Sequence, residues 1–236
     1  TFLKTDKQVP SYNVLMPLLY LRYHFPDEWY DKKRDIQKYL LRTSLTGAFS
    51  GSSDTLIDKV VKHIKEKKSF DLPHVLDEIR DAGRNLKVSK DTIMSLQYTS
   101  KEVHLFFNIW YGFNYQPARQ QNQPQIDHIF PQSELKQVKD VSPDTGRRSI
   151  MRYRKWHRDQ IANLMLLTQE ENGSGGKTDI LPEEWFDDKS DEYLELHLIP
   201  KNRELWKLEN FEEFIEARKE LILKKFDYLI YKETEE

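Results

Sequence analysis

The stretch Gln125-Ile-Asp-His-Ile-Phe-Pro-Gln-Ser133 carries the sharpest signal in the chain. Ile126–Phe130 is short, partly β-branched and closed by Pro131, which predicts a strand. Asp127 and His128 are adjacent in it, and neighbours in a strand point to opposite faces. A carboxylate binds a hard cation and a neutral imidazole takes a proton from water, so the pair suits metal-assisted phosphodiester hydrolysis. The alternative is a strand-end pair that only completes a hydrogen-bond network.

A second segment, Ile161-Ala-Asn-Leu-Met-Leu-Leu-Thr168, predicts another short strand and contains Asn163. Asn172 follows nine residues later and leads into a glycine-rich turn at Gly173–Gly176. An amide in a strand can orient an imidazole or its backbone, and an amide at the start of a helix can turn its oxygen to a metal. Taken alone, this spacing carries no functional information, since Asn before Gly is typical of a turn.

Most of the remaining chain has the composition and spacing of helices. The 236 residues include only 8 Gly and 10 Pro, and 32% are charged. Helices are expected over residues 12–23, 31–49, 54–64, 73–84, 90–96, 103–111 and 211–229, with a linker at 116–125 and polar irregular chain over 133–159. The predicted fold class is therefore mainly α: a helical bundle that carries a small ββα unit.

The composition excludes several classes of protein. Cysteine is absent, which excludes disulfide frameworks, Cys-ligated zinc and Cys nucleophiles. No apolar run approaches the roughly 20 residues that span a bilayer. The net charge of −2 hides an acidic stretch, Glu183–Glu195, and a basic stretch, Arg147–Arg158. The basic stretch is expected to bind DNA phosphates. The alternative is a solvated helix face. The six cations of this stretch are Arg147, Arg148, Arg152, Arg154, Lys155 and Arg158.

Together the two strand segments resemble the HNH, or His-Me finger, nucleases. In that ββα-metal motif the first strand supplies Asp-His, the second strand supplies Asn, and the following helix supplies Asn or His. Most of the chain resembles the C-terminal portion of GmrSD-type, modification-dependent restriction enzymes and related phage-defence proteins such as SspE. The similar stretches are Gly47–Asp54, Val103–Trp110, Gln125–Ser133, Ile161–Asn172, His197–Pro200 and Asn210–Phe214.

The resemblance implies a metal-dependent DNA endonuclease, the effector part of a restriction or anti-phage system. It implies that His128 is the general base and that Asp127 ligates a single Mg²⁺ or Mn²⁺. Asn172 would be the second protein ligand and part of the catalytic set, and Asn163 would support His128 from the neighbouring strand. The insert between His128 and Asn163 is longer than in the HNH domains of RNA-guided CRISPR nucleases, which the local motif also resembles.

The resemblance also implies an organisation in three parts. Residues 1–115 would be a helical connector, 116–200 the HNH-like nuclease region, and 201–236 a C-terminal helix that packs on the core. The chain begins with Thr1 rather than Met, so we expect a piece of a longer protein with an upstream nucleotide-hydrolysing sensor. The expected partner is DNA, including modified phage DNA, in a bacterial or archaeal cytoplasm, with no membrane contact.

Two other functions stay open from the sequence. One is a catalytically silent HNH scaffold that only binds DNA, and the other is a general nuclease that also cleaves RNA. His157 is a further candidate for a catalytic histidine, and Glu184 for a further metal ligand. The DNA modification, the choice between nicking and double-strand cleavage, the metal and the oligomeric state do not follow from the sequence.

Overall fold

The structure is a computed structural model that describes residues 3, 5–112, 125–172 and 176–231. It is mainly helical, as the sequence predicts, with a few short strands. The α-helices are α1 (Met16–His24), α2 (Pro26–Asp31), α3 (Lys33–Leu45), α4 (Asp54–Lys67), α5 (Leu72–Asp81), α6 (Lys90–Met94), α7 (Val103–Trp110), α8 (Gln132–Gln137), α9 (Lys155–Arg158), α10 (Gln169–Asn172), α11 (Pro182–Trp185), α12 (Asp191–Leu196) and α13 (Phe211–Lys225). The strands are β1 (Gln125–His128), β2 (Lys139–Val141), β3 (Arg148–Met151) and β4 (Leu164–Leu167).

The chain divides into two compact units. The first comprises the described residues up to Thr92, with His104–Phe106 and the residues from Ile230 onward. The second comprises Ile93–Val103 and the described residues of Phe107–Leu229. The expected border at residue 115 lies outside the described residues. The second unit holds both segments of the predicted motif together with α13.

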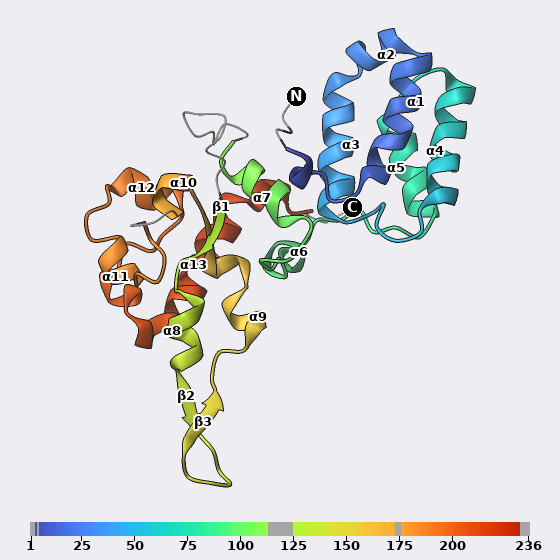
Figure 1. Cartoon of the computed structure of the whole chain (residues 1–236). Helices are drawn as coiled ribbons and strands as arrows, with labels where there is room; N and C mark the ends of the chain where they lie inside the picture. The colour runs from blue at the N-terminus through green and yellow to red at the C-terminus, as the bar shows by residue number, and fades with distance from the viewer. Residues whose placement is uncertain (1–2, 4, 113–124, 173–175, 232–236) are drawn as a thin grey trace, which may run out of the picture. The chain divides into compact units, whose positions relative to one another are not determined.

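The first unit is a bundle of α1–α5, which run side by side in Figure 1. Leu56, Val60 and Ile64 recur at helical spacing along α4 and are buried in its core. Tyr39 from α3 is fully buried among them, and its ring meets that of Phe70 edge to face at 5.6 Å. The apolar spacing in the sequence therefore predicts this bundle correctly.

The starts of α1 and α4 show two local features of this unit. Pro17 lies in the first turn of α1, where a missing N–H costs nothing, and not at a kink within the helix. Ser53 is the N-cap residue of α4, but its side chain makes no capping bond. Its hydroxyl instead accepts a hydrogen bond from Nδ2 of Asn13 at 2.7 Å, so it links the start of α4 to the segment before α1.

The second unit is built around β1, β4 and α13. The strands β1 and β4 form an antiparallel pair, and all four residues of β4 are buried. Phe130, just after β1, packs edge to face on Phe211 and Phe214 of α13 at 5.2 and 5.0 Å. No helix within the described residues is long and apolar enough to cross a membrane.

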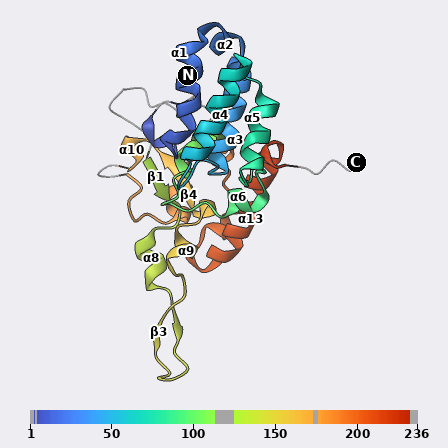
Figure 2. The ribbon, with the colours of Figure 1, turned by 90° about the vertical axis from the view of Figure 1, so that its right-hand side faces the viewer.

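The segment expected to be irregular, residues 133–159, is ordered into helices and a hairpin. It contains α8, the antiparallel pair β2–β3 and α9. Figures 1 and 2 show the hairpin as an extension that leaves the second unit beyond α8 and α9. All four residues of β3 are exposed, so this strand has no buried face. Without a buried face a strand shows no apolar alternation, which is why the sequence pattern did not reveal it.

Candidate active site

The two motif segments meet as a short antiparallel ribbon. Asp127 lies opposite Met165, and His128 lies opposite Leu164. The helix α10 follows β4 after one residue and ends at Asn172. Asn163 belongs to a 3₁₀ turn that precedes β4, so the expectation that it lies within the strand is corrected by one residue.

The alternation of β1 separates the two candidate side chains. Gln125 and Asp127 point to one face, whereas Ile126 and His128 point to the other and are buried. The motif therefore has two sides that share one strand. One side is built around His128 and the other around Asp127.

The His128 side is a compact polar cluster. Nε2 of His128 lies 2.9 Å from Oδ1 of Asp159, and Nε2 of Gln132 donates to the same oxygen at 2.9 Å. The His128 side chain is 11% exposed and that of Asp159 is 3% exposed. The ring of Tyr98 stacks on the imidazole, with ring centroids 5.0 Å apart. No described residue hydrogen bonds to Nδ1 of His128.

The surroundings of His128 favour a neutral imidazole. Burial lowers its pKa below the ordinary value, and the hydrogen bond and charge of Asp159 oppose this only in part. A carboxylate accepts but does not donate, so the consistent assignment is that Nε2–H donates to Asp159. Nδ1 then carries the lone pair, which is the form a general base needs.

Asn163 supports the backbone around His128 and does not contact the imidazole. Its Oδ1 accepts from the N–H of Phe130 at 2.9 Å, and its Nδ2 donates to the carbonyls of Phe130 and Arg158 at 3.2 and 2.8 Å. The side chain is fully buried. It therefore ties the end of β1 to the end of α9, next to Asp159.

The other side of β1 carries Asp127 and a buried lysine. The ammonium of Lys177 donates to the carbonyl of His128 at 2.6 Å and lies 3.4 Å from Oδ2 of Asp127, an ion pair longer than an ordinary hydrogen bond. The Lys177 side chain is 0% exposed. Burial lowers the pKa of Lys177, and the charge of Asp127 opposes that shift. Asn172 lies on this side too, since its Nδ2 donates to Oε1 of Gln125 at 2.7 Å.

Lys177 reaches this position through a tight turn after α10. The N–H of Lys177 donates to the carbonyl of Glu171 at 2.6 Å. A Cβ on Gly176 would lie 2.1 Å from the same carbonyl oxygen, so only glycine fits there. Thr168 and Glu171 begin α10 with reciprocal hydrogen bonds, from Thr168 N–H to Glu171 Oε2 at 2.8 Å and from Glu171 N–H to Thr168 Oγ1 at 3.2 Å.

The donor atoms around Asp127 fit a hard cation. Oδ2 of Asp127 is buried and accepts no hydrogen bond from a described residue. The amide of Asn172 uses its nitrogen on Gln125, which leaves the oxygen for a ligand. Carboxylate and amide oxygens suit Mg²⁺ or Mn²⁺. Among the described residues, no group of three or more His, Cys, Asp and Glu side chains could hold a metal ion.

The six cations of the basic stretch differ in exposure and in whether they bond to other parts of the protein. Arg147, Arg148, Arg154 and Lys155 are exposed. Arg152 is exposed but is ion-paired with Asp140 at 2.7 Å. Arg158 is buried, and its guanidinium donates to the carbonyl of Tyr153. It therefore serves the structure around Asp159, and its expected contact with phosphate has no support in this geometry.

The two further candidates from the sequence, His157 and Glu184, make other contacts. Nδ1 of His157 accepts a hydrogen bond from the N–H of Arg154 at 3.1 Å, which caps α9. Glu184 lines a pocket of 490 Å³ with Glu134 and Asp179. Neither contact connects these residues to His128 or Asp127.

Sequence reasoning missed Asp159, Gln132, Tyr98 and Lys177. Gln132 belongs to the stretch Gln125–Ser133, and Lys177 directly follows the glycine-rich turn Gly173–Gly176. Both residues could therefore have been identified from the sequence. Asp159 is the first acidic residue after the basic stretch. Its position in the sequence does not indicate a contact with His128, which only the fold brings about. Tyr98 has no local signal, because it reaches His128 through the pairing of Gln97 with Gln160.

The comparisons with known proteins identify the family. No curated protein matches the chain. The family described as GmrSD restriction endonucleases, C-terminal domain, matches residues 27–225, which include both sides of β1, α10 and the hairpin. Because this match covers well over half of the chain, the chain belongs to the family of GmrSD restriction endonuclease C-terminal domains.

Proposed function

We propose that this chain is a metal-dependent DNA endonuclease of the HNH type, with β1, β4 and α10 as its ββα-metal motif. Family membership supports a nuclease, a hydrolase in general terms, and restriction enzymes act on DNA. The observation that carries the finer proposal is the cluster at the end of β1. There Asp159 holds Nε2 of His128 at 2.9 Å while no described residue engages Nδ1.

His128 is the proposed general base. With Nε2–H donated to Asp159, the lone pair on Nδ1 accepts the proton of a water molecule that attacks the phosphorus atom. The bond from phosphorus to the leaving oxygen breaks, and that oxygen takes a proton from solvent. The buried Asp159 carboxylate then stabilises the imidazolium that forms. Tyr98 stacked on the ring and Gln132 on the carboxylate keep the imidazole from rotating. General-base catalysis of this kind contributes roughly 10²–10⁴ to a rate.

Asp127 and Asn172 are the proposed protein ligands of a single Mg²⁺ or Mn²⁺. A bound divalent ion supplies Lewis-acid stabilisation of the charge that develops on the phosphate and the leaving oxygen. Asp127 offers a buried oxygen without a hydrogen bond, and α10 carries the amide of Asn172. Asp127 and His128 are neighbours on opposite faces of β1, so the proposal places the cleaved phosphate across the end of the strand, between the two side chains.

Asn163 and Lys177 are proposed as positioning residues. Asn163 fixes the chain on both sides of the His128 cluster through Phe130 and Arg158. Lys177 fixes the carbonyl of His128 from the opposite side. Restriction of modified phage DNA, directed by a sensor elsewhere in the protein, is the biological setting that we propose from the family resemblance.

A plasmid-nicking assay tests this function. Supercoiled DNA is incubated with wild type, His128→Ala and Asp127→Ala in Mg²⁺, in Mn²⁺ and in EDTA. The matched control is His24→Ala, since His24 is exposed on the first unit. We expect His128→Ala to lower the nicking rate roughly 10²–10⁴-fold and EDTA to abolish it, with the control unchanged.

The same assay separates the alternatives. Equal nicking by wild type and His128→Ala would reject the assigned base. DNA binding without cleavage in either metal would favour a silent scaffold. Equal cleavage of RNA and DNA of the same sequence would favour a general nuclease.

A further inference from the structure

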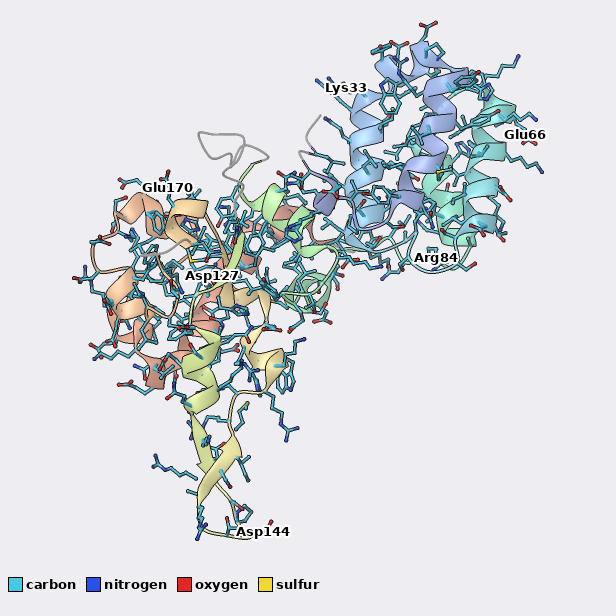
Figure 3. The ribbon with its side chains drawn as sticks, in the orientation of Figure 1. Lys33, Glu66, Arg84, Asp127, Asp144 and Glu170 are labelled. Atoms are coloured by element: carbon cyan, nitrogen blue, oxygen red, sulfur yellow. The ribbon has the colours of Figure 1, made fainter. Side chains whose placement is uncertain are left out.

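The β2–β3 hairpin is an arm without a core of its own. Residues 143–152 are all exposed, and Figure 3 labels Asp144 at its far end. The turn is closed by the bond from the N–H of Ser142 to the carbonyl of Arg147 at 2.8 Å, with Gly146 at φ +64°. Val141 and Ile150 are 55% and 41% exposed. An isolated two-stranded ribbon is only marginally stable in water, so the fold gains little from this arm.

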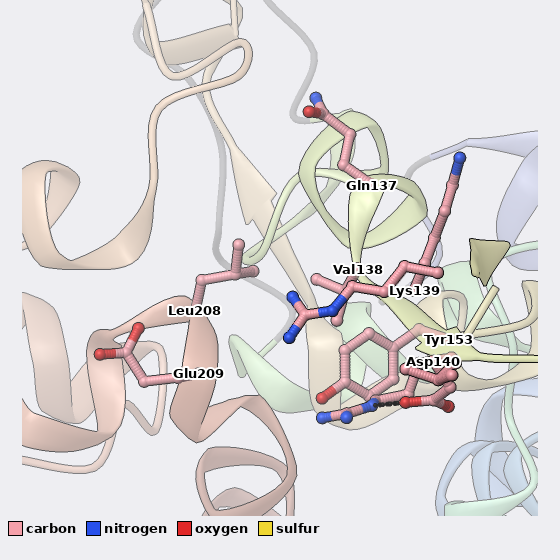
Figure 4. A pocket seen from close by; sticks show the side chains of 10 residues that line it. Gln137, Val138, Lys139, Asp140, Tyr153, Leu208 and Glu209 are labelled. Atoms are coloured by element: carbon pink, nitrogen blue, oxygen red, sulfur yellow. Dashed lines mark hydrogen bonds and ion pairs between the residues drawn. The ribbon is translucent and has the colours of Figure 1, made fainter. Parts of the chain in front are cut away.

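The arm presents cations that no described carboxylate neutralises. Between Lys139 and Arg152 there are four basic and two acidic residues, a net charge of +2. Arg152 is ion-paired with Asp140, as the dashed line in Figure 4 marks at the pocket beside the hairpin. Lys139, Arg147 and Arg148 are exposed and lie in no ion pair among the described residues. These three side chains are therefore available to phosphates.

The two ends of the arm are connected to the His128 cluster. On one side α8 begins at Gln132, and on the other side α9 is followed directly by Asp159. Both of these residues contact His128. The six residues of α8 rise about 9 Å, and the seven residues from Val138 to Asp144 extend at most about 23 Å. The tip is therefore at most about 32 Å from the cluster, which is within one turn of a DNA duplex at roughly 34 Å.

We propose that the β2–β3 hairpin is a docking arm that enters the major groove of duplex DNA within one helical turn of the bond that is cleaved. The major groove is wide enough for a two-stranded ribbon, and the arm offers three cations and no buried face. The proposal rests on the proposed function, because it places the cleaved bond at His128. It assigns contact with phosphates to Lys139, Arg147 and Arg148, and leaves Arg152 and Arg158 to structural roles.

The test measures binding without cleavage. A labelled duplex of about three helical turns is titrated in EDTA at several salt concentrations, and binding is followed by fluorescence anisotropy. The arm variant is Lys139→Ala/Arg147→Ala/Arg148→Ala. The control variant, Lys59→Ala/Lys65→Ala/Lys67→Ala, removes the same charge from exposed positions on α4. We expect the arm variant to bind at least about 10-fold more weakly than wild type. The slope of log K against log salt concentration should become shallower by about 2.7, which is three phosphate contacts at about 0.9 each. The control variant should retain the wild-type affinity and slope.

The outcomes distinguish the arm from the nuclease. Equal binding and salt slope for the arm and control variants would overturn the docking arm, and the proposed function would stand if wild type still nicks plasmid. Tighter binding to the single strand than to the duplex would also overturn groove docking. If the arm variant binds like wild type but nicks more slowly, the arm has a role in the site and the docking proposal fails. A wild type that neither binds nor nicks DNA would reject both proposals.

Discussion

Nε2 of His128 lies 2.9 Å from Oδ1 of Asp159, although 31 residues separate the two along the chain. His128 ends β1, and Asp159 follows α9 just before the turn into β4. The segment between His128 and Asn163 therefore leaves the candidate site and returns to it. Its first helix brings Gln132 to the same carboxylate oxygen.

Asp159→Asn is expected to lower the nicking rate at least about 10-fold, by less than the roughly 10²–10⁴-fold expected for His128→Ala. An asparagine keeps the size of the side chain but can no longer stabilise the imidazolium by charge, and its amide can turn a donor toward Nε2. Single-turnover plasmid nicking measures the effect, and a thermal melt checks the fold. Asp58→Asn, at an exposed position on α4, is the control. Wild-type nicking by Asp159→Asn would remove Asp159 from the mechanism.

Gly176→Ala is expected to disturb the Lys177 side of the motif. The new Cβ would lie 2.1 Å from the carbonyl oxygen of Glu171, and forcing such an overlap costs about 1–3 kcal/mol. The turn has to open, which withdraws Lys177 from the carbonyl of His128. We expect lower stability in urea and slower nicking.

Gly51→Ala serves as the control for this substitution. Gly51 has φ +70° and no atom within 4 Å of a Cβ, so alanine there adds only backbone strain in the first unit. The control is expected to nick at the wild-type rate. If both variants nick alike, the tight turn at Gly176 is not needed for the site.

Helices such as α4 were predictable because one stripe of their surface is buried. The apolar residues of α4 at Leu56, Val60 and Ile64 follow a period near 3.6, and burial against the bundle is the cause of that period. The same reasoning predicts α5 and α13. It failed for β2–β3, because a ribbon that is exposed on both faces is under no pressure to alternate apolar and polar residues.

The site was predictable where it is local and hidden where it is long-range. Asp127 and His128 are adjacent in the sequence, and their type and order suggested the chemistry. Asp159 and Tyr98 reach the imidazole only through tertiary structure. Arg158 reads as one more surface cation in a basic stretch, yet it is buried on the carbonyl of Tyr153, because charge patterning does not report where the chain folds inward.

Lys177→Met is expected to bind Mn²⁺ more tightly and to nick DNA more slowly. The ammonium lies 3.4 Å from Oδ2 of Asp127 and repels a cation at that oxygen. Its removal also frees the carbonyl of His128, which loosens the strand end. Calorimetric titration with Mn²⁺ measures binding independently of activity. Lys189→Met, at a surface lysine paired with Asp188, is the control, and unchanged Mn²⁺ affinity in Lys177→Met would argue against a metal at Asp127.

His197 is expected to make stability fall in acid. Burial, assisted by the charges of Arg218 and Lys225, lowers its pKa to about 3. Below pH ~6.5 the unfolded chain binds this proton and the folded chain does not, so stability is lost as the pH falls from about 6.5 toward 3, by up to about 1.4 kcal/mol per pH unit. Urea unfolding at several pH values measures this slope.

His197→Asn is expected to flatten that slope. The hydroxyl of Tyr111 lies 2.7 Å from Nδ1 of His197, and the amide oxygen of asparagine can take the place of that nitrogen without titrating. His24→Asn, at an exposed histidine, should retain the wild-type slope. An unchanged slope in His197→Asn would mean that other groups cause the acid dependence.

Arg218→Met is expected to destabilise the second unit by about 3–5 kcal/mol, the usual cost of breaking a buried charged network. The guanidinium is fully buried and has no carboxylate partner among the described residues. It donates to the carbonyls of Ala162, Leu164 and His197 at 2.9, 2.8 and 2.9 Å. Burial lowers its pKa to about 9, so it stays charged at neutral pH, and its loss leaves these carbonyls without a donor.

Arg218→Lys tests whether geometry or charge matters. A lysine keeps the charge but cannot reach carbonyls on two segments with one ammonium, because it lacks the planar fork of arginine. Since Ala162 and Leu164 flank Asn163, we expect Arg218→Lys to slow nicking as well as lower the urea midpoint. Lys219→Met, next to it on α13 and partly exposed, should change stability by no more than about 0.5 kcal/mol. If Arg218→Lys unfolds and nicks like wild type, charge alone suffices and the site does not depend on this anchor.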